Sequence, residues 1–163
     1  MTDKRVNSNI TIEGGNILPG SFRNFSGSPD RFNPDGGIRS FCVALDEGTV
    51  KYGGRPADIH DLAADGWNVK FLQPRDEQDN PKPFIRVRVK YGVRPPKIVQ
   101  ITGHGKVELD EESIDQLDWA EIKNADVIIN PYNYDSGKVT AYLHALYVTI
   151  SEDEFASKYY DEE

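Results

Sequence analysis

The sequence predicts a mainly β protein built around a strongly curved sheet of about five strands. Several segments alternate apolar and polar residues with a period of two, which is typical of strands with one buried face. A capped apolar pattern predicts a helix before the last two strands, and acidic residues dominate after residue 150. An immunoglobulin-like sandwich would lack that helix, and a doubly wound fold would contain more helices. The pattern therefore predicts an OB-fold-like five-stranded barrel with one helix before the last strands and a flexible acidic tail.

Composition bounds the class of protein. The 163 residues are expected to form one domain over residues 1–150 and an acidic tail over residues 151–163. No apolar run is long enough to cross a bilayer, and the first residues lack the apolar core of a signal peptide. The single cysteine, Cys42, excludes an internal disulfide and a cysteine-rich zinc site, and its apolar neighbours indicate core packing. We therefore expect a cytoplasmic protein without a membrane partner.

The N-terminal part combines two predicted strands with a turn-rich loop. Residues 9–13 and 38–45 have strand patterns, and glycines and prolines interrupt residues 21–37 between them. Aromatic rings in a polar loop either anchor it to the barrel or stack on bases, and both alternatives stay open for each ring. The loop and its end carry aromatic and basic residues in alternation: Phe22, Arg23, Phe25, Arg31, Phe32 and Arg39.

The next segment predicts a short helix followed by a long hairpin. Residues 47–55 indicate a loop or an irregular hairpin, and the sequence assigns no role to the segment over residues 47–61. The helical pattern over residues 57–65 ends at Gly66, the kind of residue that commonly terminates a helix in a left-handed conformation. Residues 67–71 then alternate as a strand, with Trp67 on the apolar side, which favours a place for this ring in the core.

The strand over residues 83–91 carries the main functional hypothesis. Its apolar residues fall on one face, and Arg86, Arg88 and Lys90 fall on the other, about 7 Å apart along the strand. Phosphates of an extended nucleic-acid strand follow one another at a similar interval of roughly 6–7 Å. Phe84 and Tyr91 flank the three cations. The strand is therefore interpreted as the floor of a single-stranded nucleic-acid groove, the alternative being an ordinary solvated strand face.

The C-terminal part predicts a strand, a helix and two further strands. Residues 97–101 form the first strand, and Asp110 suits the N-cap of a helix of roughly three turns. Residues 127–132 form the next strand, which Pro131 is expected to kink or end. The last strand spans residues 139–150, and its phase slips near Ala145, which predicts a bulge.

Charge is distributed unevenly along the chain. The net charge is −8, yet residues 70–106 carry a balance of +6 and residues 107–163 a balance of −12. Such polarity indicates charged partners. Acidic tails often serve solubility alone, but a tail beside a basic groove can also occupy that groove and bind basic partner proteins.

The sequence contains little that indicates catalysis. His60, His104 and His144 are far apart, and phosphate-binding loops, nucleophile elbows and dinucleotide fingerprints are missing. The triplet Glu121-Ile122-Lys123 is of the acid-x-Lys kind found in metal-dependent nucleases, but it lies at the end of the predicted helix among solvated acids. We expect no enzyme activity, no metal and no cofactor.

Several segments together resemble one family. Asn24-Phe25-Ser26-Gly27, the strand over residues 39–45, the segment over residues 64–70, Pro95-Pro96-Lys97-Ile98-Val99, Leu117-Asp118-Trp119 and Ala141-Tyr142-Leu143 span most of residues 20–155. In this pattern the chain resembles the small single-stranded DNA-binding proteins of tailed bacteriophages. The resemblance implies an OB-type barrel, an acidic tail that recruits replication proteins, and a possible homodimer. Best-known members end in an aromatic residue, whereas this chain ends Asp161-Glu162-Glu163.

Residues and resemblance together predict a protein that coats and protects single-stranded DNA without reading sequence, in phage replication, recombination and repair in the host cytoplasm. The alternatives are an acidic interaction module or DNA mimic that binds a basic host protein, and the nuclease. The predicted DNA-binding residues are Arg86, Arg88, Lys90, Lys70, Phe84, Tyr91, Phe22, Arg23, Phe25, Arg31, Arg39 and Arg94, and Phe32 and Trp67 are further candidates for stacking. The predicted partner-binding and DNA-competing tail residues are Glu152, Asp153, Glu154, Phe155, Tyr159, Tyr160, Asp161, Glu162 and Glu163.

Overall fold

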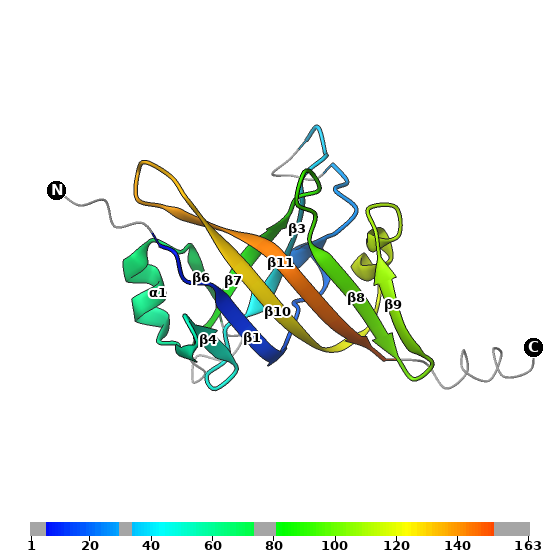
Figure 1. Cartoon of the computed structure of the whole chain (residues 1–163), viewed down its shortest axis with the longest axis horizontal. Coiled ribbons are helices and arrows are strands. Elements are labelled where there is room, and N and C mark those ends of the chain that lie inside the picture. Colours follow the sequence, from blue (N-terminus) through cyan, green and yellow to red (C-terminus); the bar gives the residue numbers. More distant parts are fainter. Residues whose placement is uncertain (1–5, 30–33, 74–80, 152–163) are drawn as a thin grey trace, which may run out of the picture.

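The computed structural model describes residues 6–29, 34–73 and 81–151, and these residues form one large, curved β-sheet. The predicted mainly β class is therefore confirmed. Five strands form the barrel: β1 (Ile10–Gly15), β3 (Arg39–Ala44), β7 (Lys82–Val89), β10 (Ile122–Asn133) and β11 (Val139–Ile150). β10 and β11 form a long hairpin across the barrel, with the helix α1 (Ile59–Asp65) at one side and strands β8 and β9 at the other (Figure 1).

The pairing of these five strands returns to its starting point. β3 pairs with β7, β7 lies parallel to β11, β11 pairs with β10, and β10 pairs with β1. The chain just after β1 then closes the circuit against β3, because Ile17 bridges to Val43 and the Leu18 amide donates to the Cys42 carbonyl at 2.9 Å. If β1, β3, β7, β10 and β11 are numbered 1 to 5 as barrel strands, their spatial order is 1-2-3-5-4-1, and the pair of strands 3 and 5 is parallel. This is the circuit of a five-stranded OB-type barrel.

The remaining elements extend this barrel. β8 continues along β11 beyond the residues that pair with β7, and β9 folds back on β8. β6 pairs with the first half of β7, and β4 joins β1 and carries β5 as a small hairpin, in the segment for which the sequence allowed an irregular hairpin. Their bounds are β2 (Arg23–Asn24), β4 (Val50–Tyr52), β5 (Arg55–Pro56), β6 (Val69–Leu72), β8 (Lys97–Thr102), β9 (Gly105–Leu109), η1 (Gly20–Phe22) and η2 (Ile114–Asp118).

The helix α1 ends where the sequence predicts, and it begins at Ile59, later than the predicted residue 57. The Asp58 carboxylate accepts a hydrogen bond from the His60 amide at 2.8 Å, which caps the first turn. Gly66 ends the helix with φ +108°, a conformation that a side chain would strain. A Cβ at Gly66 would also collide with the Gly137 carbonyl in the β10–β11 turn. The end of α1 is therefore fitted closely against the tip of the long hairpin.

The helical segment before the last two strands is shorter than predicted. It is the five-residue 3-10 helix η2, and the residues after Glu121 already belong to β10. Asp110 is not the N-cap of η2, because that position is Ser113, without a side-chain cap hydrogen bond. The Asp110 Oδ1 instead accepts from the Glu112 and Ser113 amides at 3.1 and 3.0 Å in the turn that precedes η2. Ile114 and Leu117 are three residues apart and both fully buried, a spacing that matches the three-residue turn of a 3-10 helix.

Two details of the last hairpin concern its register. The predicted bulge is present, since Ile128 pairs with Ala145 and the next residue, Ile129, pairs with Leu143. Pro131, in contrast, does not end its strand, because β10 continues to Asn133. β1 pairs with β10 no further than Ile129, so Pro131 lies where β10 has β11 on one side only. A proline is tolerated at such an edge because its missing amide deprives no neighbouring strand of a donor.

The core lies inside the barrel and is apolar. Ile85, Val87 and Val89 of β7 are buried, as their alternation predicts, and Trp67 is in the core with 3% of its surface exposed. The Trp67 indole donates to the Tyr52 hydroxyl at 3.1 Å, and this hydroxyl donates to the Asp65 carboxylate at 2.7 Å. Among the described residues, no helix is long and apolar enough to span a bilayer.

Candidate nucleic-acid interface

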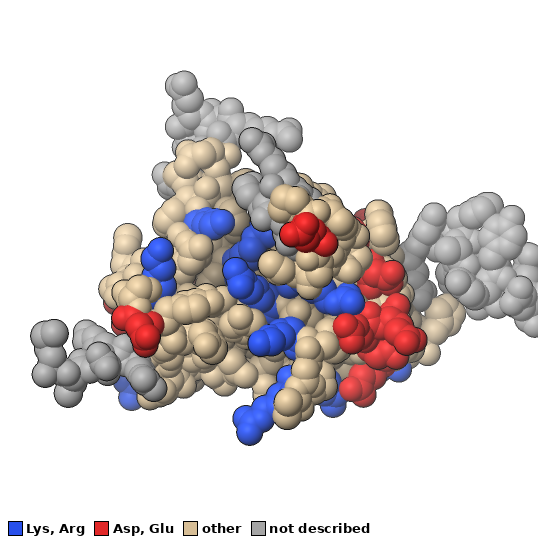
Figure 2. All heavy atoms as spheres, turned by 90° about the horizontal axis from the view of Figure 1, so that it is seen from above, with Lys and Arg blue, Asp and Glu red and all other residues tan. Residues whose placement is uncertain are grey.

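The outer face of β7 carries a row of cations. We call Lys70, Arg86, Arg88 and Lys90 the basic stripe. Arg88 and Lys90 are exposed and Arg86 is half-buried, on the face opposite the core residues of β7. Lys70 extends the row onto β6, where it pairs with Phe84 and shares its face. Figure 2 shows Lys and Arg side chains gathered in the middle of one face of the molecule, with Asp and Glu gathered beside them.

Small residues of β3 form the floor beside the basic stripe. Ser40 and Cys42 of β3 pair with Arg88 and Arg86 of β7, and both β3 residues are buried. The Arg86 guanidinium donates to the Ser40 hydroxyl at 3.0 Å, which orients its side chain across β3. Burial raises the pKa of the Cys42 thiol, although the nearby Arg86 and Lys70 act in the opposite direction. The floor is therefore neutral, which agrees with the predicted packing role of Cys42.

Three tyrosines continue the basic stripe onto β11 and β10. We call Tyr132, Tyr134 and Tyr142 the tyrosine cluster. Tyr142 lies beside Arg88 in the parallel β7–β11 pair, and its ring is 5.8 Å from that of Tyr132. The Tyr132 and Tyr134 rings are 5.1 Å apart, and these two residues are 53% and 43% exposed. Together with Lys90 the three rings line a hollow of about 230 Å³.

Sequence analysis did not assign a role to the tyrosine cluster. Tyr132 near the end of β10 and Tyr134 just after it are two residues apart, as successive cations of β7 are, which is a usable signal for a shared exposed face. The neighbourhood of Tyr142 and Arg88, however, depends on a parallel register between strands more than fifty residues apart. Nothing in the local sequence pattern fixes that register.

The aromatic residues that the sequence placed in the groove are mostly covered. Phe25 is fully buried and stacks on Phe41 with ring centroids 5.0 Å apart, so its ring is closed to a base in this structure. Phe84 is 7% exposed and is covered edge-on by Phe22, with ring centroids 5.5 Å apart. Tyr91 is half-buried, and burial raises the pKa of its hydroxyl. Of these rings, Phe22 and Tyr91 retain partial access.

Arg23 is held by the fold and does not face the basic stripe. Its guanidinium and Nε donate to the carbonyls of Leu18 at 3.0 Å, Ala120 at 2.6 Å and Leu117 at 3.3 Å. Burial lowers the pKa of Arg23, and the neighbouring Asp118 carboxylate partly offsets this. Arg23 therefore joins the N-terminal loop to the segment around η2. In this structure its side chain has a structural role, whereas the sequence predicts that it binds DNA.

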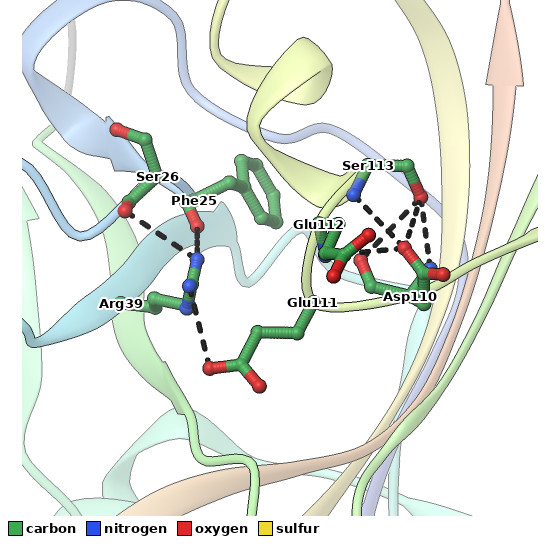
Figure 3. Close-up of polar contacts among 7 residues, drawn as sticks. All are labelled: Phe25, Ser26, Arg39, Asp110, Glu111, Glu112 and Ser113. Carbon is green, nitrogen blue, oxygen red and sulfur yellow. Dashed lines mark hydrogen bonds and ion pairs between the residues drawn. The ribbon is translucent and has the colours of Figure 1, made fainter.

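Arg39 is likewise engaged within the protein (Figure 3). Its Nη1 donates to the Phe25 carbonyl at 3.0 Å and the Ser26 carbonyl at 3.4 Å, and its Nη2 lies 3.5 Å from Glu111 Oε1. The same guanidinium lies 5.7 Å from the centre of the Tyr91 ring. Arg39 thus connects the N-terminal loop, the start of the β7–β8 connection and the acidic turn before η2.

The other predicted site residues divide into two groups. Arg94 is exposed in the connection between β7 and β8. Arg31 and Phe32 lie outside the described residues. Of the predicted tail over residues 151–163, the structure describes Ser151 alone. The predicted tail residues that therefore also lie outside the described residues are Glu152, Asp153, Glu154, Phe155, Tyr159, Tyr160, Asp161, Glu162 and Glu163.

The acid-x-Lys triplet lies in a different element from the one expected. Glu121 immediately precedes β10, and Ile122 and Lys123 are its first residues, so the triplet begins a strand and does not end a helix. The Glu121 carbonyl accepts the Ser151 amide at 2.7 Å, which ties it to the end of β11. Within the described part of the chain, no three His, Cys, Asp or Glu side chains are grouped as a metal site would require.

The comparison with protein families agrees with this geometry. Residues 1–162 match the model of the family described as "Putative phage ssDNA-binding domain", and the chain belongs to this family. The family confirms the resemblance seen in the sequence and supports single-stranded DNA as the binding partner. Neither a curated protein nor a solved structure matches the chain at a significant level.

Proposed function

We propose that the protein binds single-stranded DNA along the basic stripe and the tyrosine cluster, and so coats and protects single strands during phage DNA replication, recombination and repair in the host cytoplasm. The observation that supports this proposal is the continuity of the two features. Arg88 and Tyr142 are neighbours in the β7–β11 pair, and the half-buried Tyr142 contacts the exposed Tyr132. The row of cations therefore leads directly to the tyrosine cluster.

The cations and the rings have complementary roles in this proposal. Lys70, Arg86, Arg88 and Lys90 neutralise phosphates and release counterions, which makes binding dependent on salt. Tyr132, Tyr134 and Tyr142 stack on bases, and stacking contributes roughly 1–3 kcal/mol per base. Because every base has a flat face and every nucleotide a phosphate, this arrangement binds single strands with little dependence on sequence.

A duplex does not suit such a surface. Its bases are already stacked and paired, so the tyrosine cluster gains nothing unless the strands separate. We therefore expect the basic stripe to bind duplex DNA through its charge alone, and more weakly than a single strand of the same length.

The acidic tail has two proposed roles. Residues 152–163 contain six acids and one lysine, together with Phe155, Tyr159 and Tyr160. Such a segment can compete with DNA for the basic stripe and can bind basic surfaces of replication or recombination proteins. Binding of DNA would then release the tail to its partner proteins.

The test is a fluorescence and mobility-shift titration with oligothymidine at low and high salt, with duplex DNA of equal length alongside. We expect tight binding of the single strand, weakening with salt, and weaker binding of the duplex. Removal of residues 152–163 should tighten single-strand binding, because a competing polyanion is gone. If the truncated protein ignores the oligonucleotide at every salt concentration, the proposal fails, and a basic host protein becomes the partner to search for.

A further inference from the structure

Strand β9 has an open edge. Within the described part of the chain β9 pairs with β8 alone, and Figure 1 shows it at the border of the sheet. Gly105, Lys106, Val107 and Glu108 are all exposed, and Val107 exposes 57% of its surface. In an antiparallel ladder every second residue directs its backbone N–H and C=O away from its neighbour. β9 therefore presents unpaired backbone donors and acceptors to any strand that approaches it.

The side chains on this edge are complementary to themselves. Lys106 and Glu108 flank Val107, and neither charge makes an ion pair or a side-chain hydrogen bond with another described residue. If a second β9 pairs antiparallel with the first and the two Val107 residues face each other, Lys106 faces Glu108 of the other copy. The same contact recurs on the opposite side of the twofold axis. Directly opposed residues share a face, so each pair joins unlike charges and the two valines meet on the other face.

We propose that two copies of this chain associate through β9, with the strands antiparallel and centred on Val107. The sheet then runs without a break from β11 and β8 of one copy through both β9 strands to β8 and β11 of the other. This proposal is independent of DNA binding, because none of its residues belongs to the basic stripe or the tyrosine cluster. It assigns a surface to the homodimer that the family resemblance left open.

The size of the contact sets the expected strength. Pairing over the five residues of β9 is small beside the surfaces of roughly 1,200–2,000 Å² that join stable complexes. We therefore expect reversible dimers in solution. Copies held side by side on one DNA strand meet at a high effective concentration, so the same contact becomes more populated there.

Charge reversal tests this arrangement. In Lys106→Glu every 106–108 contact joins two acids, and in Glu108→Lys every such contact joins two lysines. Each single variant should be monomeric at concentrations where the unaltered chain dimerises, measured by sedimentation velocity on the full chain over a concentration series. Both positions are exposed, so circular dichroism should show an unchanged fold.

Two further samples distinguish strand pairing from a general effect of charge. The double variant Lys106→Glu/Glu108→Lys restores unlike charges at every contact and should dimerise again. A mixture of the two single variants should form heterodimers, seen as energy transfer between differently labelled chains, because their charges complement each other. A monomeric unaltered chain at every concentration, or single variants that dimerise as well as the unaltered chain, would overturn the proposal.

Discussion

The arginines of β7 and the arginines beside the N-terminal loop differ in how many hydrogen bonds their side chains make within the protein. Arg88 projects from a strand whose other face fills the core, and the Arg86 guanidinium donates to the Ser40 hydroxyl, its single hydrogen bond to the described residues. Arg23 and Arg39 instead donate to several backbone carbonyls that lie outside helices and strands. A strand satisfies its own backbone in the ladder and leaves its side chains free, whereas a loop takes donors from side chains. The position of a cation in the fold therefore decides whether it can serve a ligand.

This comparison is tested most strongly at Arg23. Arg23→Ala removes a charged donor from four carbonyls, and hydrogen bonds to charged groups are individually worth about 1.5–3 kcal/mol. We expect the free energy of unfolding in urea to fall by about 3 kcal/mol, while the folded fraction keeps its affinity for oligothymidine. Arg23→Lys should restore part of the stability. Unchanged stability with a tenfold loss of affinity would make Arg23 a DNA contact.

The basic stripe should show the reverse behaviour. In Arg86→Ala/Arg88→Ala we expect roughly 30-fold weaker binding of oligothymidine at low salt, about 2 kcal/mol, with little change in stability. The slope of log affinity against log salt should flatten by about 1.4, since each phosphate contact contributes about 0.7 on a single strand. Lys51→Ala/Arg55→Ala removes the same charge from β4 and β5 and serves as the control. Equal losses in both variants would show that total charge, and not the basic stripe, attracts the DNA.

The tyrosine cluster separates contacts to bases from contacts to phosphates. Tyr132→Ala/Tyr142→Ala should weaken binding of oligothymidine about tenfold, a loss at the lower end of the range for stacked bases. Binding of an abasic strand of equal length should change little, because only the phosphates remain to be bound. Tyr147→Ala, on the same strand β11 but beside β8, is the matched control. An equal loss of affinity for oligothymidine and for the abasic DNA would instead mean that the tyrosines only shape the surface around Lys90.

The smallest effect concerns the acidic turn before η2. The pKa of Asp110 is held below its ordinary value because its carboxylate accepts hydrogen bonds from the Ser113 hydroxyl, the Ser113 amide and the Glu112 amide. This stabilisation is present above the ordinary carboxyl pKa of about 4 and is lost as the pH falls through the lowered value. The difference in urea midpoint between the unaltered chain and Asp110→Asn should therefore shrink below pH 4. A difference that stays constant with pH would contradict this.

The sequence predicts those features that depend on local pattern. The alternation of Ile85, Val87 and Val89 with the cations identifies both faces of β7, and Gly66 marks the C-terminal end of α1. These features follow from the geometry of single strands and helices. The bulge near Ala145 is likewise predicted by a slip in the apolar alternation of residues 139–150.

Features that depend on distant contacts were predicted less well. Phe25 and Phe22 lie in a loop whose residues are not periodic, so the sequence could not decide between packing and stacking; the structure buries Phe25 against Phe41. The tyrosine cluster was missed because the parallel register that places Tyr142 beside Arg88 is a property of the closed barrel. The 3-10 form of η2 was not predicted, because residues three apart, such as Ile114 and Leu117, also share one face of an α-helix.

The central place of β11 has a consequence for how the protein reaches its fold. β11 pairs with β7, β8 and β10, so each of these three strands gains a neighbour on its second edge only when residues 139–150 are present. During synthesis the ribosome makes this strand after all its partners, and until then one edge of each of β7, β8 and β10 stays unpaired. Contacts between segments so far apart in the chain form slowly, and open strand edges promote aggregation. We therefore expect that chains interrupted before residue 139 do not fold, and that mutations in β11 reduce the yield of soluble protein more than mutations in β4 or β5.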